Sequence, residues 1–281
     1  MRLIKMTGGL GNQMFIYALY LRMRRRYPHT RIDLSDMMHY RAHNGYELPR
    51  VFRTPPSEVC LPRWVKKIVE FLFFRTILER HERGSLRHYD GPVRWPLVYY
   101  KGFYQRTAYL EGIEDEVRQV FRFHEEQASA RTQALLRQIE GDAHAVSLHV
   151  RRGDYQQEPF YSTIGCVCTE TYYLRAIEAL RQRVPGMHCY VFSDDPGWVR
   201  ARLALPEAVY VDWNHGPDSW QDMMLMLACR HHIIANSTFS WWAAWLGSGQ
   251  GRITVAPARW YAGQPLAPDL YPAHWLRVAT D

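Results

Sequence analysis

The second half of the chain alternates short apolar runs with longer stretches of helical periodicity. This alternation is typical of a parallel sheet covered by helices. The runs of strand length are Ala145–Val150, Cys189–Ser193, Ala208–Asp212, His232–Ala235 and Ile253–Ala256. Helical spacing of apolar residues falls between and after them, at 169–184, 196–204, 218–230 and 238–247. The pattern therefore predicts a doubly wound α/β domain over residues 142–281.

The first half opens in a similar way and then loses its regularity. Its start predicts a strand over Arg2–Met6, a glycine turn over Thr7–Gly11 and a helix over Asn12–Tyr27. The turn matches neither G-x-G-x-x-G nor a Walker loop, although Asn12 could cap the helix. Residues 28–62 contain prolines and little periodicity, which predicts a long loop region that shapes an acceptor cleft. Further expected elements are helices near 63–80, 106–119 and 125–140 and a strand around Leu97–Tyr100. We expect these to form a separate domain over residues 1–141.

Polar clusters follow four of the predicted strands in the second half. Because the carboxyl ends of parallel strands meet at one sheet edge, where open α/β folds bind ligands, we expect these clusters to converge. They are Arg151-Arg152-Gly153-Asp154, Ser193-Asp194-Asp195, Asp212-Trp213-Asn214 and Asn236-Ser237-Thr238-Phe239-Ser240.

The arginine pair after the first of these strands favours a diphosphate ligand. A guanidinium binds phosphate oxygens in a bidentate way and stays charged at every working pH. Strand parity places Arg151 on the side of His149 and Arg152 on the side of Val150, so we assign Arg151 to the ligand and Arg152 in part to structure. Gly153 would let the turn approach the ligand closely. The alternative is an Arg–Asp pair that only ties the loop down.

The remaining clusters admit both a binding and a structural interpretation. Asn236, Ser237 and Thr238 could offer hydroxyls and free amides to a phosphate at a helix start, or could simply cap that helix. Ser193 and Asp194 could accept hydrogen bonds from ribose or guanine, or could cap the helix that follows. The closely spaced tryptophans are expected to pack in the core: Trp241, Trp242 and Trp245.

Composition narrows the choice of partner. The 281 residues carry a formal charge of +7, which favours an anionic ligand or surface. The arginines are scattered and no nucleic-acid motif is present, so nucleic acid is not an expected partner. Five cysteines without a paired C-x-x-C indicate neither zinc nor a disulfide framework.

Trp64–Arg75 is aromatic and basic but too short to span a bilayer, so we expect a core-facing helix, with a membrane-surface helix as the alternative.

Metal-ion chemistry is not expected. The sequence contains no D-x-D pair, and Asp194-Asp195 runs directly into a proline. A nucleotide-sugar enzyme of this kind would have to neutralise the departing diphosphate with cationic side chains and helix amides. Arg151 and the helix start at Asn236 could supply these groups.

Four motifs lie at residues 8–15, 149–155, 191–195 and 236–242. Taken together they resemble the inverting α-1,2-fucosyltransferases of glycosyltransferase family 11. The resemblance implies a GT-B-like fold of two Rossmann-like domains facing a central cleft, and transfer of fucose from GDP-fucose to a galactose 2-hydroxyl with inversion and without metal. On this resemblance Arg151 matches the arginine that binds the diphosphate. The donor-binding set becomes Gly11, Asn12 and Gln13 from the first domain, and His149, Arg151, Arg152, Ser193, Asp194, Asn236, Ser237, Thr238, Phe239 and Ser240 from the second.

Inversion calls for a base that deprotonates the attacking hydroxyl, or for a loose, oxocarbenium-like departure in which the base matters less. Asp154 and Glu158 are the candidate bases beside Arg151 in the catalytic set. Asp154 lies close to two arginines, and a carboxylate engaged as their partner is a poor base. Glu158 lies on the stretch Gln156–Pro159, and the two candidates stay open.

Two other function classes stay open at this point. The many aromatic residues would also suit a non-catalytic carbohydrate- or nucleotide-binding module, and a related transferase could use another linkage or GDP-sugar. The expected acceptor is a galactose-terminated oligosaccharide, with a lipid carrier as one option, and the oligomeric state is open. The N-terminus lacks the layout of a signal peptide, so we expect a cytoplasmic protein, either free or resting on the inner membrane surface.

Overall fold

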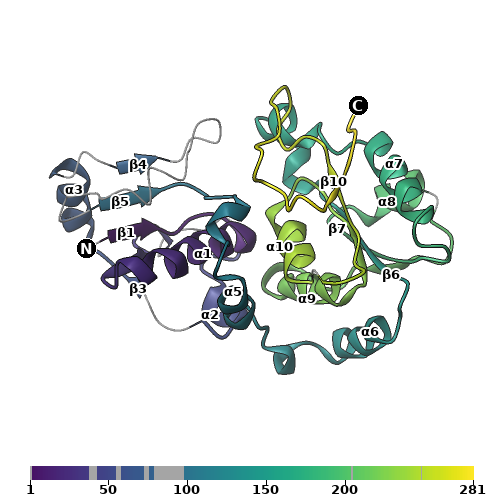
Figure 1. Ribbon diagram of the computed structural model, residues 1–281, viewed down its shortest axis with the longest axis horizontal. Helices are drawn as coiled ribbons and strands as arrows, with labels where there is room; N and C mark the ends of the chain where they lie inside the picture. The colour runs from purple at the N-terminus through teal and green to yellow at the C-terminus, as the bar shows by residue number, and fades with distance from the viewer. Residues whose placement is uncertain are drawn as a thin grey trace. The chain divides into compact units, whose positions relative to one another are not determined.

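The computed structural model describes residues 2–37, 43–54, 58–72, 76–78, 98–203, 205–247 and 249–281. It divides into two compact units (Figure 1), the first formed by Met1–His124 with Ala267–Tyr271 and the second by Glu125–Leu266 with Pro272–Asp281. Each unit contains a parallel sheet with helices. Two Rossmann-like α/β units confirm the GT-B-like fold class, while the central cleft stays a prediction.

The sheet of the second unit has six strands in the order β11-β10-β9-β6-β7-β8, and every neighbouring pair is parallel. Read from β8, this is the 3-2-1-4-5-6 order of dinucleotide-binding folds. The chain builds β6, β7 and β8 outward in one direction and then returns to place β9 on the other side of β6. The strand order therefore reverses between β6 and β9. The bounds are β6 Ala145–Val150, β7 His188–Ser193, β8 Val209–Val211, β9 His231–Ile233, β10 Thr254–Pro257 and β11 Leu276–Val278.

Helices cover both faces of this sheet, with α7 and α8 on one face and α9 and α10 on the other (Figure 1). All residues of β6 are buried, as expected for a central strand. Trp241 and Trp242 are fully buried and contact Trp245 and Trp275, which confirms the expected packing role of the α10 tryptophans. The bounds are α7 Glu170–Arg181, α8 Pro196–Arg202, α9 Trp220–Ala228 and α10 Thr238–Leu246. Strand β11 lies beyond the predicted elements and completes the sheet edge.

Helix α6 (Ala130–Glu140) belongs to the second unit, whereas the sequence division after residue 141 assigns it to the first. Its N-cap residue Ser129 donates its backbone N–H to Gln221 Oε1 at 2.9 Å. The Thr132 hydroxyl donates to Asn214 Oδ1 at 3.1 Å and accepts from Trp213 Nε1 at 3.1 Å. These bonds, which periodicity does not reveal, hold α6 to α9 and to the segment after β8.

The sheet of the first unit has the order β3-β2-β1-β5-β4, also with parallel pairs throughout. The prediction of a long loop over residues 28–62 is wrong, because β2, α2 and β3 lie within it. Strand β2 was missed because Thr-Arg-Ile-Asp is short and mostly polar, and pairing with β1 and β3 makes it a strand. The strands are β1 Arg2–Lys5, β2 Thr30–Asp33, β3 Glu58–Val59, β4 Thr76–Leu78 and β5 Val98–Lys101.

The helices of the first unit differ from the predicted ones in their ends. Helix α1 begins at Leu10, and its N-cap is Gly9, so Asn12 lies within the first turn and does not cap it. The predicted helix near 63–80 ends at Leu72, and that near 106–119 is a 3-10 turn followed by α5. Part of the predicted helix near 63–80 lies outside the described residues, namely 73–75 and 79–80. The same holds for Leu97 of the predicted strand. The bounds are α1 Leu10–Arg26, α2 Leu48–Val51, α3 Arg63–Leu72 and α5 Glu114–Val120.

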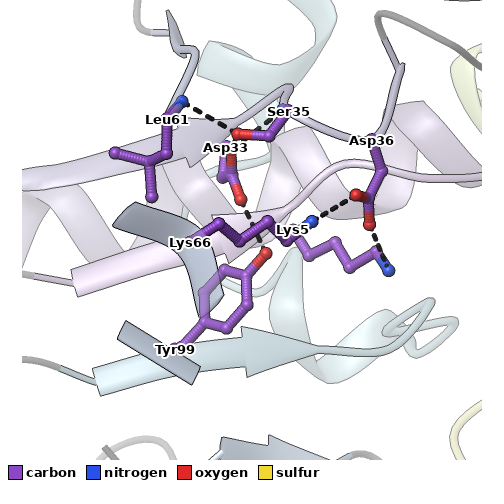
Figure 2. Close-up of polar contacts among 7 residues, drawn as sticks. All are labelled: Lys5, Asp33, Ser35, Asp36, Leu61, Lys66 and Tyr99. Atoms are coloured by element: carbon purple, nitrogen blue, oxygen red, sulfur yellow. Dashed lines mark hydrogen bonds and ion pairs between the residues drawn. The ribbon is translucent and has the colours of Figure 1, made fainter. Parts of the chain in front are cut away.

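A polar network holds the segment after β2 to its neighbours (Figure 2). Buried Asp33 accepts hydrogen bonds from the Tyr99 hydroxyl at 2.6 Å and from the N–H and hydroxyl of Ser35. The Ser35 hydroxyl accepts from the N–H of Leu61 at 2.8 Å. Asp36 pairs with Lys5 at 2.6 Å and with Lys66 of α3. Side chains from β1, β2, β5 and α3 therefore meet at the carboxyl end of this sheet.

The face of α3 that carries Trp64, Ile68 and Phe71 is exposed, so the expectation of a core-facing helix is wrong for these residues. Lys66 on the other side instead anchors the helix through Asp36. Contact with a membrane surface stays a prediction. Within the described residues, no helix combines the length and the apolar character needed to cross a bilayer.

Asp222 of α9 gives the second unit a measurable pH dependence. Burial raises the pKa of Asp222 to about 7, against the opposing hydrogen bond from Asn214 Nδ2 at 2.8 Å. A carboxyl whose folded pKa lies above its unfolded value costs stability as pH rises from about 4 to about 7. We therefore expect Asp222→Asn, which keeps an acceptor for Asn214, to raise the free energy of unfolding at pH 8 by about 1–3 kcal/mol.

Urea unfolding at a series of pH values measures this effect. The gain should disappear below about pH 4, where both forms of the protein carry a neutral side chain at this position. Asp218→Asn, at an exposed position in the preceding turn, is the matched control and should change stability little at any pH. A gain that is constant from pH 4 to pH 8 would contradict the assignment.

Candidate active site at the reversal of strand order

The loops after β6 and β9 lie at the point where the strand order of the second unit reverses, which is where open α/β sheets bind ligands. The two strands are direct neighbours, with Leu148 paired to Ile233. The Tyr155 hydroxyl donates to the backbone oxygen of Asn236 at 3.3 Å and joins the two loops. The Arg151 and Asn236 clusters are therefore brought to one edge, as the sequence predicts.

Arg151 lies between two carboxylates. Its Nη2 contacts Asp154 Oδ1 at 2.6 Å, and its Nη1 contacts Asp194 Oδ2 at 2.8 Å. About 30% of the Arg151 side chain remains exposed. Asp154 is 42% exposed and Asp194 only 25%, so the two partners differ in how easily they could release the guanidinium. Asp194 thus orients Arg151, and Asp154 occupies its more accessible side.

Arg152 has the structural role predicted from strand parity. Its Nε contacts Asp195 Oδ2 at 3.0 Å, and its guanidinium carbon lies 4.4 Å from the centre of the Trp198 ring. Its backbone N–H donates to Asp194 Oδ1 at 2.8 Å. Both arginines are therefore tied to the segment that follows β7, but through different faces of the loop.

Gly153 lies directly beside the carboxylate of Asp194. A Cβ at this position would lie 2.5 Å from Asp194 Oδ2. The glycine therefore makes room for the carboxylate that holds Arg151, and a close approach to a ligand stays a prediction. Asp194, predicted to accept hydrogen bonds from ribose or guanine, has one oxygen on the Arg151 guanidinium and the other on the Arg152 amide.

Ser193 and Asp195 organise the start of α8. The Ser193 hydroxyl accepts from the N–H of Asp195 at 3.0 Å, and Asp195 Oδ1 accepts from the N–H of Trp198 at 3.0 Å as the helix N-cap. The capping alternative is therefore realised here, through Asp195. Binding of the donor by Ser193 stays a prediction.

Asn236 acts as a clamp inside the protein. Its Nδ2 donates to the carbonyls of Ile164 at 2.9 Å and Trp260 at 3.0 Å, and the residue is almost fully buried. Both amide hydrogens are therefore used before any ligand arrives. The clamp joins the start of α10 to two segments that are distant in the sequence.

The residues after Asn236 begin α10. Ser237 is the N-cap, and its hydroxyl accepts from the N–H of Phe239 at 3.4 Å. The buried Ser240 donates its hydroxyl to the Ser237 carbonyl at 3.4 Å. Thr238 and Phe239 are half-buried. The first turn of this helix retains backbone amides without intrahelical partners, and these suit an anion.

His149 lies at the end of β6 as a buried, neutral imidazole. Burial, and secondarily the charge of Arg151, lower the pKa of His149 to about 3. Its ring centre lies 5.9 Å from that of Phe239. Within the part of the chain that the structure describes, its buried Nδ1 has no hydrogen-bond partner. The side chain thus offers one nitrogen at the loop that carries Arg151.

The two candidate bases have different surroundings. Asp154 is the ion-pair partner of Arg151. Glu158 is exposed, and its Oε2 accepts from the Ser162 hydroxyl at 2.8 Å. The remaining carboxylate surface of Glu158 faces solvent, which leaves it available to accept a proton.

The glycine turn of the first unit is stabilised by its own motif residues. Gln13 is fully buried; its Nε2 donates to the carbonyls of Gly8 and Gly45, and its Oε1 accepts from the N–H of Glu47. Asn12 Oδ1 accepts from Gln105 Nε2 at 2.8 Å, and Gly11 is buried in α1. These bonds give Asn12 and Gln13 structural partners, and their part in donor binding stays a prediction.

The arginines in the last turns of α1 have partners at and before the start of α5. Arg24 and Arg25 pair with Glu116 at 2.8 and 3.0 Å. Arg22 donates to the carbonyl of Glu111 at 2.8 Å. This group therefore attaches α1 to the start of α5.

Tyr155 is a site residue that the sequence interpretation did not select. Burial raises the pKa of Tyr155 far above its ordinary value, so its hydroxyl stays protonated and donates to Asn236. Its ring lies 5.5 Å from the Arg151 guanidinium carbon. Its position directly after the Arg-Arg-Gly-Asp run was the available signal. Among the residues with described positions, no three His, Cys, Asp or Glu side chains gather as a metal site.

We expect removal of the Asn236 side chain to lower the stability of the protein. In Asn236→Ala, the buried carbonyls of Ile164 and Trp260 lose their donor, and the free energy of unfolding should fall by about 1–3 kcal/mol. Urea unfolding measures this, with Thr238→Ala as a half-buried neighbour that should change stability by less than about 0.5 kcal/mol. Unchanged stability together with lost GDP affinity would instead favour a direct ligand role.

Comparisons with known proteins identify the family of this chain. The family model described as "Glycosyl transferase family 11" matches residues 63–279. An α-1,2-colitosyltransferase of Escherichia coli is 31% identical, covering 98% of this chain and 97% of the relative. The O-antigen biosynthesis glycosyltransferase WbnK of Escherichia coli is 28% identical, covering 92% of this chain and 94% of the relative. Human galactoside α-(1,2)-fucosyltransferase 1 is 26% identical, covering 86% of this chain and 64% of the relative.

Solved structures with similar chains include POFUT1 in complex with GDP, with a TM-score of 0.49, 13% identity and coverage of 91% of this chain and 97% of that chain. The NodZ α-1,6-fucosyltransferase soaked with GDP-fucose has a TM-score of 0.48 and 12% identity, covering 87% of this chain and 92% of that chain. The family match spans most of the sequence, including every motif of the second unit, and the chain belongs to glycosyltransferase family 11.

Proposed function

We propose that this protein transfers fucose from GDP-fucose to the 2-hydroxyl of a galactose, with inversion and without a metal ion. The observation that supports this most directly is the position of Arg151. A partly exposed guanidinium, oriented by Asp194, lies at the reversal of strand order beside the loop that starts α10. A fixed cation at this edge suits the diphosphate of a nucleotide sugar.

Binding of the diphosphate would exchange one anionic partner of Arg151 for another. Asp154 is the more exposed of its two carboxylates and the one that a phosphate would displace. Asp194 would remain and keep the guanidinium in place. The free amides of the first turn of α10 and the unpartnered Nδ1 of His149 are further groups that could hydrogen-bond the donor. Together these groups would stabilise the charge that develops on the leaving diphosphate.

Glu158 is the carboxylate that we propose as the proton acceptor. Asp154 already neutralises Arg151, whereas Glu158 accepts hydrogen bonds from neutral groups of Ser162, its hydroxyl at 2.8 Å and its N–H at 3.4 Å. Removal of a proton from the galactose hydroxyl by Glu158 would leave Asp154 to regulate access to Arg151. The two candidates thus receive different tasks, one in chemistry and one in donor binding.

A second donor is supported by the comparisons. The relative at 31% identity is named an α-1,2-colitosyltransferase, and the galactoside fucosyltransferases match at lower identity. Colitose is fucose without its 3-hydroxyl, so a site for one sugar differs from a site for the other by a single polar contact. GDP-colitose is therefore the alternative donor. The name of WbnK, an O-antigen biosynthesis glycosyltransferase, likewise supports an oligosaccharide of O-antigen biosynthesis as the acceptor.

Turnover of GDP-sugars tests the function. In EDTA, GDP-fucose and a β-galactoside should yield GDP and an α-1,2-linked product, and GDP-colitose and GDP-mannose serve as competing donors. Arg151→Ala should lose about 2–4 kcal/mol of transition-state stabilisation, or roughly 30- to 1,000-fold in kcat/KM. Arg181→Ala, which removes an exposed arginine paired with Glu178, should leave turnover unchanged.

Two results would contradict the proposal. Absence of transfer across a broad acceptor panel would count against the enzyme class. A glycan affinity that survives Arg151→Ala, without turnover in the unmodified protein, would indicate a binding module instead. Activity that requires an added divalent cation would refute only the metal-independent part.

The division of roles between the two carboxylates is tested separately. Glu158→Gln should lower kcat by about 10²- to 10⁴-fold and leave GDP affinity unchanged. Asp154→Asn should act mainly on the donor KM, since Asp154 contacts Arg151. Glu178→Gln is the control for loss of an exposed carboxylate. A normal kcat in Glu158→Gln would exclude Glu158 as the base.

A further inference from the structure

The segment between Glu158 and Gly165 exposes two aromatic side chains at the same sheet edge as Arg151. Phe160 is 48% exposed and Tyr161 is 45% exposed. We propose that these two residues form the platform on which the galactose of the acceptor stacks. This inference rests on the proposed function, because it places the acceptor beside the donor site.

The polar side chains of this segment are exposed, but their hydroxyls are used in hydrogen bonds within the turn. The hydroxyl of Ser162 donates to Glu158, and that of Thr163 donates to the Pro159 carbonyl at 3.1 Å. These hydroxyls form hydrogen bonds within the turn, while about half of each aromatic side chain is exposed to solvent. Exposure of two neighbouring aromatic rings costs hydrophobic free energy, and a partner with an apolar face would recover it.

The segment is firmly held despite its exposure. The Asn236 amide binds the carbonyl of Ile164 at 2.9 Å, and the N–H of Ala262 donates to the carbonyl of Thr163 at 2.8 Å. A Cβ at Gly165 would overlap the carbonyl oxygen of Tyr155, so the two backbones are in direct contact. The platform is therefore fixed to the loops that carry Arg151 and begin α10. A fixed aromatic surface loses little entropy when a ligand binds.

The chemistry of galactose fits this surface. One face of the galactose ring presents carbon-bound hydrogens, which pack on an aromatic face, while its hydroxyls remain free for polar contacts. The acceptor is a better occupant than the donor, since the donor's charged diphosphate is assigned to Arg151. Glu158 lies two residues before Phe160 in the chain, so a galactose bound at the platform would lie on the loop that carries the proposed base.

Kinetic constants for acceptor and donor test the platform. Phe160→Ala and Tyr161→Ala should each raise the acceptor KM about three- to tenfold, and Tyr161→Phe should restore it, because the ring and not the hydroxyl supplies the contact. The GDP affinity measured by calorimetry should stay within about twofold of the unmodified protein. Leu174→Ala, at an equally exposed apolar position of α7 (44%), is the matched control and should change neither constant.

The outcomes separate this inference from the proposed function. Transfer by the unmodified protein, with acceptor KM unchanged in both alanine variants, would overturn the platform and leave the function intact. An equal loss of GDP affinity would assign the aromatic residues to the donor and overturn it as well. Saturation-transfer NMR of a methyl β-galactoside with the GDP-bound protein gives a readout without turnover, and absence of an alanine-sensitive signal there would also overturn the platform.

Discussion

The carboxylate of Asp194 fixes the geometry on which the candidate site depends. One oxygen binds the Arg151 guanidinium at 2.8 Å and the other the Arg152 backbone amide at 2.8 Å, so a residue after β7 sets both the position and the direction of the loop after β6. Only a glycine at position 153 leaves room for this carboxylate. The guanidinium is therefore oriented before any ligand binds, and this lowers the entropy lost on binding.

The charges around Arg151 explain how such a site could bind a diphosphate selectively. Arg151 and Arg152 face three carboxylates, those of Asp154, Asp194 and Asp195, so the cluster has no surplus of positive charge. His149 adds none, because burial keeps its imidazole neutral. An incoming anion must displace a carboxylate from the guanidinium. An anion that binds in a bidentate way recovers the free energy lost with that ion pair. The net charge of +7 resides elsewhere on the chain.

The sequence predicted the sheet edge well and the tasks of single residues less well. Strand β6 follows from an apolar run that is local in the sequence. The convergence of the polar clusters follows from the general topology of parallel sheets. The role of Asn236 could not be read in this way, because its partners Ile164 and Trp260 are far away in the chain. An asparagine side chain is also suited both to a ligand and to a distant carbonyl, so the residue type does not distinguish the two roles. Strand β2 was missed for a similar reason, since its pairing with β1 makes it a strand.

The heavy use of motif side chains in structural hydrogen bonds follows from where they lie. Loops at the carboxyl edge of a sheet leave the ladder of backbone hydrogen bonds, so their buried amides and carbonyls need partners from side chains. Gln13 makes one such bond to the glycine turn, at Gly8, and two to the segment of Gly45 and Glu47, and Asn236 supplies two to the segments beside α10. The groups left accessible are then few and well placed. On the proposed function, the accessible side chains at the edge of the second unit, those of Arg151, Asp154 and Glu158, perform the chemistry, while Asn236 holds the neighbouring segments in position.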